Sequence, residues 1–275
     1  MSYPGLTLPS HARAPIGVYD SGVGGVSVLR ALRAALPDES FIYVSDSLHA
    51  PYGERPHEVI QARAHTVVDF LVRQGVKAVV LACNTVSVAA AASLRAVHAF
   101  PIVAMEPAIK PASMSTRSGA ILVLATSYTV GSPAVERLCR EFGTNVRIVL
   151  QACPGLVELV ERGALTSPQT DSLLRAYLQP GIDAGADTIV LGCTHYAFLS
   201  ERIARLSGPG LSIIEPSDAV ARQLRSRLAD MGASAPRAPT SAVFYTSGSV
   251  ELLQAFLARV NEDDASVHPL PDEIR

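Results

Sequence analysis

The sequence is poor in cysteine, in net charge and in long hydrophobic runs, and each shortage excludes a class of protein. Four cysteines among 275 residues, none in a Cys-x-x-Cys pair, fit neither a disulfide framework nor a zinc ribbon, so we expect reduced thiols. A formal net charge of −2, with only 23 Lys and Arg, leaves no basic stripe for nucleic acid. No run approaches the roughly 18 uninterrupted apolar residues of a membrane span, and residues 1–15 hold no apolar signal segment. We therefore expect a cytoplasmic protein with no nucleic-acid partner and no membrane association, for which small anions remain candidate ligands.

Apolar strand candidates alternate with amphipathic helical stretches along most of the chain. This alternation predicts an α/β fold of doubly wound parallel sheets. With 48% hydrophobic residues, the chain can bury one large core or two cores of roughly 100–150 residues each. The strand candidates are residues 16–19, 41–45, 78–82, 102–105, 120–125, 146–150, 188–191, 211–215 and 242–245. So many strands exceed what one sheet usually holds, and we expect two domains.

Two breaks in this pattern divide the chain. Glu106-Pro107 begins a new element directly after the fourth strand candidate, and Ser207-Gly208-Pro209-Gly210 has the composition of a loop. The breaks predict a first α/β domain of residues 15–103 plus 210–260 and a second α/β domain of residues 104–209 inserted into it. The polar or proline-containing ends, residues 1–14 and 261–275, are expected to be flexible.

Two short segments, residues 79–85 and 189–195, resemble each other closely. In each, an apolar run typical of a buried parallel strand ends in a cysteine, Cys83 or Cys193, and a threonine follows within two residues. Ligands of open α/β sheets bind at the carboxyl ends of strands, and a thiol there can exchange protons once its surroundings lower its pKa from about 8.5. The repeat predicts two similar domains facing each other across a cleft, with two acid/base groups directed at one substrate.

The residues beside these two cysteines distinguish them from the other two. An isolated cysteine is most often an inert buried side chain, and we interpret Cys139 and Cys153 in that way. The first strand-end cysteine is followed by Asn84-Thr85 and the second by Thr194-His195, whose polar groups cost about 1–3 kcal/mol each when buried without a partner. These polar neighbours favour a binding site over a core strand. His195 alone would suggest an ordinary histidine, but here it is placed to bind substrate or to stabilise a thiolate.

A glycine-rich turn, Asp20-Ser21-Gly22-Val23-Gly24-Gly25-Val26-Ser27, follows the first strand candidate and opens a helix. A dinucleotide fingerprint would need glycine where Ser27 stands, and Asp20 would repel a pyrophosphate. Asp46 lies where a ribose-binding acid would, which keeps a nicotinamide-linked oxidoreductase as an alternative. The better interpretation is a tight turn whose N–H groups and first serine hydroxyl receive a small carboxylate. The aspartate is then left to bind an ammonium group or to assist Cys83.

Three further elements have an ordinary structural interpretation beside a functional one. Pro51-Tyr52-Gly53 is either a turn before a helix or a lid over the site. Thr126, Ser127 and Thr129 are ordinary helix N-cap residues, and the exposed N–H groups there are also suited to hold a carboxylate. Glu158 and Glu161 follow on a later helix, and the sequence does not choose between them.

The motifs follow one another in the order Asp20-Ser21-Gly22-Val23-Gly24-Gly25, Pro51-Tyr52-Gly53, Ala82-Cys83-Asn84-Thr85, Glu106-Pro107-Ala108, Ala125-Thr126, Cys153-Pro154 with Val160-Glu161, and Leu191-Gly192-Cys193-Thr194-His195-Tyr196. Together they resemble the bacterial glutamate racemases of the aspartate/glutamate racemase superfamily, over about residues 15–244. The resemblance implies two pseudo-symmetric doubly wound parallel-sheet domains with the active site in the cleft between them. It also implies cofactor-independent interconversion of L-glutamate and D-glutamate by a two-cysteine, two-base proton transfer, which supplies D-glutamate for peptidoglycan synthesis.

Matched position by position, the resemblance assigns roles to residues of this chain. The catalytic pair falls on Cys83 and Cys193, helped by Asp20 and His195 respectively. The carboxylates that tune these acid/base groups are Asp46 and Glu161. The expected substrate contacts are Asp20, Ser21, Pro51, Tyr52, Gly53, Asn84, Thr85, Thr126, Thr194 and His195. The resemblance implies no metal and no cofactor, glutamate as the small-molecule partner, and a homodimer as one of the family's assemblies.

The chain departs from the family pattern at Ser47-Leu48-His49-Ala50, an unusual approach to Pro51 that would alter the entrance to the site. Two further interpretations stay open beside the oxidoreductase. A racemase of aspartate or another acidic amino acid would carry the same cysteine pair, because the pair does not encode side-chain length. A metal-binding module would use Cys83, Cys193 and His195 as zinc ligands.

Overall fold

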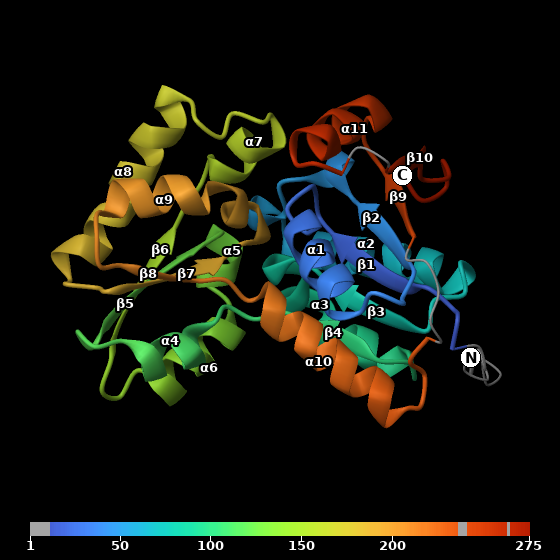
Figure 1. Ribbon diagram of the computed structural model, residues 1–275, viewed down its shortest axis with the longest axis horizontal. Helices are drawn as coiled ribbons and strands as arrows, with labels where there is room; N and C mark the ends of the chain where they lie inside the picture. The colour runs from blue at the N-terminus through green and yellow to red at the C-terminus, as the bar shows by residue number, and fades with distance from the viewer. Residues whose placement is uncertain (1–11, 236–240, 263–264) are drawn as a thin grey trace.

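Two parallel β-sheets organise the chain, whose computed structural model describes residues 12–235, 241–262 and 265–275 (Figure 1). The strands are β1 (Ile16–Asp20), β2 (Phe41–Ser45), β3 (Ala78–Leu81), β4 (Ile102–Ala104), β5 (Ala120–Ala125), β6 (Arg147–Ala152), β7 (Thr188–Gly192), β8 (Ser212–Ile214), β9 (Ala242–Thr246) and β10 (Ser266–Pro269). One sheet has six strands in the order β10-β9-β2-β1-β3-β4, and the other has four in the order β6-β5-β7-β8. Within these described ranges, neighbouring strands pair in parallel throughout.

The two sheets repeat one topology. The order β2-β1-β3-β4 in the first sheet matches β6-β5-β7-β8 in the second, and β9 and β10 extend the first sheet beyond β2. This confirms the prediction of two pseudo-symmetric α/β domains. Because the strands of a parallel sheet end at the same edge, β1 and β3 deliver their last residues to one place, and β5 and β7 do the same in the second sheet.

Helices connect the strands and pack on the sheets (Figure 1). They are α1 (Val26–Ala35), α2 (His57–Arg73), α3 (Asn84–Val97), α4 (Ile109–Ser115), α5 (Ser127–Val130), α6 (Pro133–Phe142), α7 (Leu156–Glu161), α8 (Pro168–Asp183), α9 (Ser200–Ser207), α10 (Ser217–Asp230) and α11 (Val250–Arg259), with short 3-10 helices η1 (Ser47–His49), η2 (Tyr52–Glu54) and η3 (Thr194–Leu199). Strands β1, β3, β5 and β7 are buried along their whole length, as expected for strands covered on both faces. None of the helices described is both long and apolar enough to cross a membrane.

The prediction that residues 261–275 form a flexible end is wrong for most of the residues described there. Ser266–Pro269 forms β10, which pairs with β9 at the edge of the first sheet. Leu270 and Ile274 then pack into the apolar core of that domain. An edge strand needs few apolar residues, and proline is tolerated in a sheet mainly at such an edge, so the composition of β10 resembles a loop.

The domain boundary predicted at residue 210 is also wrong. β8 pairs with β7, so the second domain extends to the end of β8, and the chain then returns to the first domain in α10, which packs on α1 (Figure 1). The glycine- and proline-rich loop at 207–210 joins α9 to β8 inside the second domain. Such a composition marks a turn but does not indicate which sheet receives the next strand. The other end predicted to be flexible is residues 1–14, of which residues 1–11 lie outside the described part of the chain.

Candidate active site

Cys83 and Cys193 occupy equivalent places in the two domains. Cys83 is the N-cap of α3 just beyond β3, and Cys193 is the N-cap of η3 just beyond β7. The two residues are buried, being 6% and 7% exposed. The charge of Cys193 is among the influences that raise the pKa of Cys83. The structure therefore brings the predicted pair within electrostatic reach of each other.

The surroundings of Cys83 favour its protonated form. The hydroxyl oxygen of Ser21 lies 3.4 Å from Sγ of Cys83, and Asp20 ends the neighbouring strand β1. Burial, followed by the negative charge of Asp20, raises the pKa of the Cys83 thiol to about 12. A thiol with that pKa keeps its proton at neutral pH and is suited to donate it to a carbanion.

Asp20 is itself fully buried. Its Oδ2 accepts a hydrogen bond of 2.6 Å from the backbone N–H of Gly25, and the hydroxyl of Tyr43 lies 3.5 Å from the same oxygen. Its Oδ1 is buried and has no hydrogen-bond partner among the residues that the structure describes. Burial raises the pKa of this carboxyl to about 6, although the charge of His195 opposes the rise. The sequence predicts that Asp20 either binds an ammonium group or assists Cys83. An ammonium group carries the positive charge that this carboxyl oxygen favours.

A different set of groups surrounds Cys193, an imidazole ring and, behind it, a carboxylate. Nδ1 of His195 lies 3.8 Å from Sγ of Cys193, and Nε2 of the same ring lies 2.6 Å from Oε1 of Glu161. Burial lowers the pKa of His195, but the hydrogen bonds to Cys193 and Glu161 outweigh it and hold the pKa well above its usual 6.5. An imidazolium in this position places a positive charge beside the Cys193 sulfur. The two thiols therefore have neighbours of opposite charge, the carboxyl of Asp20 and the imidazolium of His195.

Glu161, and not Glu158, is the α7 carboxylate that reaches the site. Besides His195, its Oε1 accepts a hydrogen bond of 2.9 Å from the backbone N–H of Val23 in the first domain. Glu158 lines two pockets beside the site, the first of which Glu161 also lines, and its Oε2 has no hydrogen-bond partner among the described residues. The sequence of α7 does not choose between Glu158 and Glu161, because the choice depends on which side of this helix faces His195 and Val23.

The glycines of the turn after β1 allow the two domains to approach closely. A Cβ atom at Gly22 would overlap the carboxylate of Glu161, and one at Gly24 would overlap the ring of His195 and the hydroxyl of Thr194. Neither glycine has a positive φ, so the space and not the backbone conformation requires glycine here. Contact between the domains thus accounts for these glycines without a dinucleotide.

Two N–H groups of the same turn are bonded to protein carboxylates, that of Val23 to Glu161 and that of Gly25 to Asp20. The prediction that the N–H groups of this turn receive a substrate carboxylate is therefore wrong for these two. The hydroxyl of Ser21 faces Cys83, where a substrate would meet it.

Hydroxyl groups from the two domains meet between α3 and α5. Oγ1 of Thr85 lies 3.0 Å from Oγ1 of Thr126 and 3.2 Å from Oγ1 of Thr129. Thr126 caps α5, because its Oγ1 accepts the backbone N–H of Thr129. Gly53 packs on this cluster, since a Cβ there would lie 2.7 Å from Cβ of Thr126. Thr129 is not among the substrate contacts that the resemblance assigns, but it is one of the helix N-cap residues that the sequence singled out.

Asn84 and Thr194, which directly follow the two cysteines, are both buried. Neither side-chain polar atom of Asn84 has a hydrogen-bond partner in the part of the chain that is described. A buried amide of this kind costs about 1–3 kcal/mol unless a ligand satisfies it. This placement suits the predicted role of Asn84 as a substrate contact.

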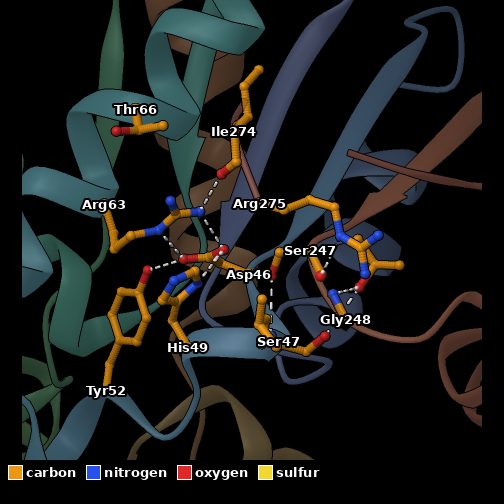
Figure 2. A network of polar contacts seen from close by, with 12 residues as sticks. Asp46, Ser47, His49, Tyr52, Arg63, Thr66, Ser247, Gly248, Ile274 and Arg275 are labelled. Atoms are coloured by element: carbon orange, nitrogen blue, oxygen red, sulfur yellow. Dashed lines mark hydrogen bonds and ion pairs between the residues drawn. The ribbon is translucent and has the colours of Figure 1, made fainter. Parts of the chain in front are cut away.

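The hydroxyl of Tyr52 points toward Asp46 (Figure 2). The hydroxyl donates a hydrogen bond to Asp46 and lies 2.8 Å from the hydroxyl of Tyr19. Because these protein groups occupy the hydroxyl, Tyr52 is left to meet a substrate through its backbone or ring. Asp46, predicted to tune the site, is linked to it through Tyr52.

A pocket of about 510 Å³ borders the site. Val23 and Glu161 line it, together with Ser47, Leu48 and Ala50 of the segment that departs from the family pattern. The segment therefore lies where the resemblance placed the entrance.

Cys139 and Cys153 are the other two thiols, and Cys153, like the strand-end pair, directly follows a strand, β6. Cys139 lies on α6, and the thiol of Cys153 donates to the carbonyl of Gln151 at 3.4 Å. Burial raises the pKa of both thiols. Across the described ranges, no three His, Cys, Asp or Glu side chains are grouped so as to hold a metal ion, so the zinc interpretation finds no ligand set there.

The sequence matches the family model described as Asp/Glu/Hydantoin racemase over residues 24–224. The chain belongs to this racemase family. A glutamate racemase of Ectopseudomonas mendocina is 46% identical over 260 residues, which cover 94% of this chain and 99% of that relative.

Solved structures of glutamate racemases share the fold of this chain. A glutamate racemase isoform of Bacillus anthracis superposes with a TM-score of 0.87 at 31% identity, covering 96% of this chain and 100% of that one. Escherichia coli glutamate racemase, solved with L-glutamate and an activator, gives a TM-score of 0.83 at 30% identity, covering 94% and 98%.

Proposed function

We propose that the protein interconverts L-glutamate and D-glutamate without a cofactor, by proton transfer between Cys83 and Cys193. The observation that carries this proposal is the opposite electrostatic setting of two buried thiols at equivalent strand ends. Inversion at an α-carbon needs a base on one face and an acid on the other, so the two groups must start in opposite protonation states. Burial and Asp20 raise the pKa of Cys83 and favour its thiol form, while the positive charge of His195 lies beside Cys193.

The proton balance of the reaction uses only these two groups. The Cys193 thiolate removes the α-proton and forms an S–H bond, while the electron pair of the broken C–H bond stays on the α-carbon. The Cys83 thiol then gives its proton to the opposite face of that carbon and becomes a thiolate. The product is the other enantiomer, and the two sulfurs have exchanged protonation states. The reverse reaction starts from this exchanged state.

Hydrogen-bond donors around the cysteines would hold the substrate carboxylates and stabilise the carbanion. The groups we assign to this role are Ser21, Asn84, Thr85, Thr126 and Thr194. All five are buried, and hydrogen bonds already in place in a water-poor site stabilise developing negative charge more than they would in water.

Glutamate is the substrate favoured by the relatives, which are named glutamate racemases and one of which was solved with L-glutamate. The cysteine pair alone does not encode side-chain length. We further propose that the enzyme is cytoplasmic and supplies D-glutamate to peptidoglycan synthesis, and that it assembles as a homodimer, as the resemblance allows.

Circular dichroism of L-glutamate and of L-aspartate, each incubated separately with the enzyme, tests the substrate. We expect the glutamate signal to decay to zero as the racemic mixture forms, at the same rate before and after treatment with a chelator, and the aspartate signal to persist. If only the aspartate signal decays, the substrate is aspartate and not glutamate. If both signals persist, the proposed racemase activity is refuted. Loss of the decay after chelation would refute the metal-free mechanism.

A further inference from the structure

A second polar network has Asp46 at its centre and includes Tyr52, the middle residue of the Pro51-Tyr52-Gly53 turn (Figure 2). Asp46 follows β2 and is fully buried. Arg63, on the facing side of α2, donates from Nε to Oδ2 of Asp46 at 2.9 Å and from Nη2 to Oδ1 at 2.7 Å. These two parallel bonds form the bidentate fork that a guanidinium makes with a carboxylate, which fixes the orientation of both groups.

The same carboxylate holds the hydroxyl of Tyr52. Burial tends to raise the pKa of Asp46, but the hydrogen bonds from Arg63 and Tyr52 outweigh it and lower that pKa, so the group stays a carboxylate. Burial raises the pKa of Tyr52 well above 10, so its hydroxyl stays a hydrogen-bond donor. In the bond between them, Tyr52 is thus the donor and Asp46 the acceptor.

Arg63 is anchored independently on its far side. Its Nη2 donates to the carbonyl oxygen of Ile274 at 2.8 Å (Figure 2). Ile274 is 3% exposed and belongs to the same apolar core as Tyr19 and Tyr52. The guanidinium is therefore held between the segment that follows β10 and the carboxylate of Asp46, and it has little freedom to swing.

Tyr52 carries this restraint to the site. It begins η2, and the next residue, Gly53, packs on Thr126 of the second domain. Pro51, on its other side, lines both pockets that border the site. A shift of the Tyr52 ring would therefore move the wall where the two domains meet beside the cysteines.

We propose that Arg63 is a positioning residue for the reaction: it holds Asp46, Asp46 holds the hydroxyl of Tyr52, and Tyr52 sets the Pro51–Gly53 turn against Thr126. This inference rests on the proposed glutamate racemase activity. Arg63 touches no reacting atom, so its effect should appear in how well substrate is bound and not in the proton-transfer chemistry.

Two single substitutions interrupt the chain of contacts at different points. Arg63→Lys keeps the positive charge beside Asp46 but removes the fork and the bond to Ile274, because an ammonium group cannot make the same planar contacts. Tyr52→Phe removes only the hydroxyl. For each we expect KM for glutamate to rise about tenfold while kcat changes less than about threefold, the pattern left when ground state and transition state lose binding equally.

The double variant distinguishes positioning from separate structural effects. If Arg63 acts through Tyr52, the Arg63→Lys, Tyr52→Phe enzyme should show the same rise of about tenfold as either single variant, because both changes cut one chain of contacts. Two independent effects would multiply to about a hundredfold. Arg73→Lys is the matched control, since Arg73 lies exposed at the end of the same helix, and it should leave both constants unchanged.

The assay is steady-state racemisation of glutamate, with thermal unfolding followed in parallel. A wild-type KM in both single variants, a multiplicative double variant, or a lowered melting temperature with KM unchanged would each overturn the proposal. If Arg63→Lys does not fold, a wild-type KM in Tyr52→Phe overturns it alone. Failure of the wild-type enzyme to racemise glutamate would instead refute the proposed function, which keeps the two failures distinct.

Discussion

The buried carboxyl group of Asp20 should lower the stability of the folded protein as the pH rises through the mildly acidic range. Its pKa is about 6 in the folded state and 3.8 for an unperturbed aspartate. Between these values the unfolded chain releases the proton while the folded protein retains it. Rising pH therefore favours unfolding, and the stability contributed by this group is complete below pH 3.8 and lost once the pH passes 6.

The size of the effect follows from the difference between the two pKa values. Each unit corresponds to about 1.4 kcal/mol, so the free energy of unfolding should fall by about 2–3 kcal/mol between pH 4 and pH 7 on account of Asp20. Asp20→Asn removes the titration and keeps an oxygen that can accept the N–H of Gly25. Relative to the wild type, the variant should gain that amount over the same interval, while its racemase activity falls because a carboxylate beside Cys83 is lost.

Urea denaturation of both proteins from pH 4 to pH 7, followed by circular dichroism, measures this difference. Effects of other titrating groups largely cancel in the comparison. Asp230→Asn, at the exposed end of α10, is the control and should show no pH-dependent gain. A difference between Asp20→Asn and wild type that stays flat to within about 0.5 kcal/mol, or that changes in the opposite direction, would refute the assignment of a raised pKa to this carboxyl.

Three further outcomes are expected. Cys83→Ser and Cys193→Ser should each lower kcat by about 10²–10⁴-fold with an unchanged far-UV spectrum, because serine is a far weaker acid, whereas Cys139→Ser should be silent in the same assays. In D2O, D-glutamate formed early from L-glutamate should carry deuterium at the α-carbon while recovered L-glutamate stays protiated; protium in the product, detected by mass spectrometry of the separated enantiomers, would contradict the two-thiol mechanism. Gly24→Ala should lower kcat/KM about tenfold or more by forcing the domains apart, whereas Gly131→Ala, whose Cβ would meet nothing nearer than 3.6 Å, should match wild-type kinetics.

The strands that are clearest in the sequence are those whose burial is visible in their own residues. Val79-Val80-Leu81 and Val190-Leu191 lie in strands covered on both faces, which demands continuous apolar runs. Ser266–Pro269 could not be recognised, because an edge strand obtains its order from backbone pairing with β9 and not from its own hydrophobicity. The sheet to which β8 belongs likewise depends on its partner, β7, and not on its sequence.

The candidate site shows the same division between local and distant information. The cysteines and their polar followers were predicted because each group lies within three consecutive residues. Arg63 was not, because its partners Asp46 and Ile274 are 17 and 211 positions away. Only the folded chain brings a guanidinium on α2 to a carboxylate after β2 and to a carbonyl after β10.

The two halves of the site place unlike groups beside the two cysteines, a carboxyl from the end of β1 beside Cys83 and an imidazolium from η3 beside Cys193. Thermodynamics limits how far this difference between the two halves can affect the rates of a racemase. Mirror-image amino acids have equal free energies in water, so their equilibrium constant is one at every pH, and kcat/KM must be the same in both directions whatever each half contains. The difference between the two halves can therefore change kcat and KM separately in each direction, but only in a way that keeps their ratio equal. An enzyme of this construction would favour neither enantiomer at low concentration, yet become faster in one direction than the other once substrate saturates it.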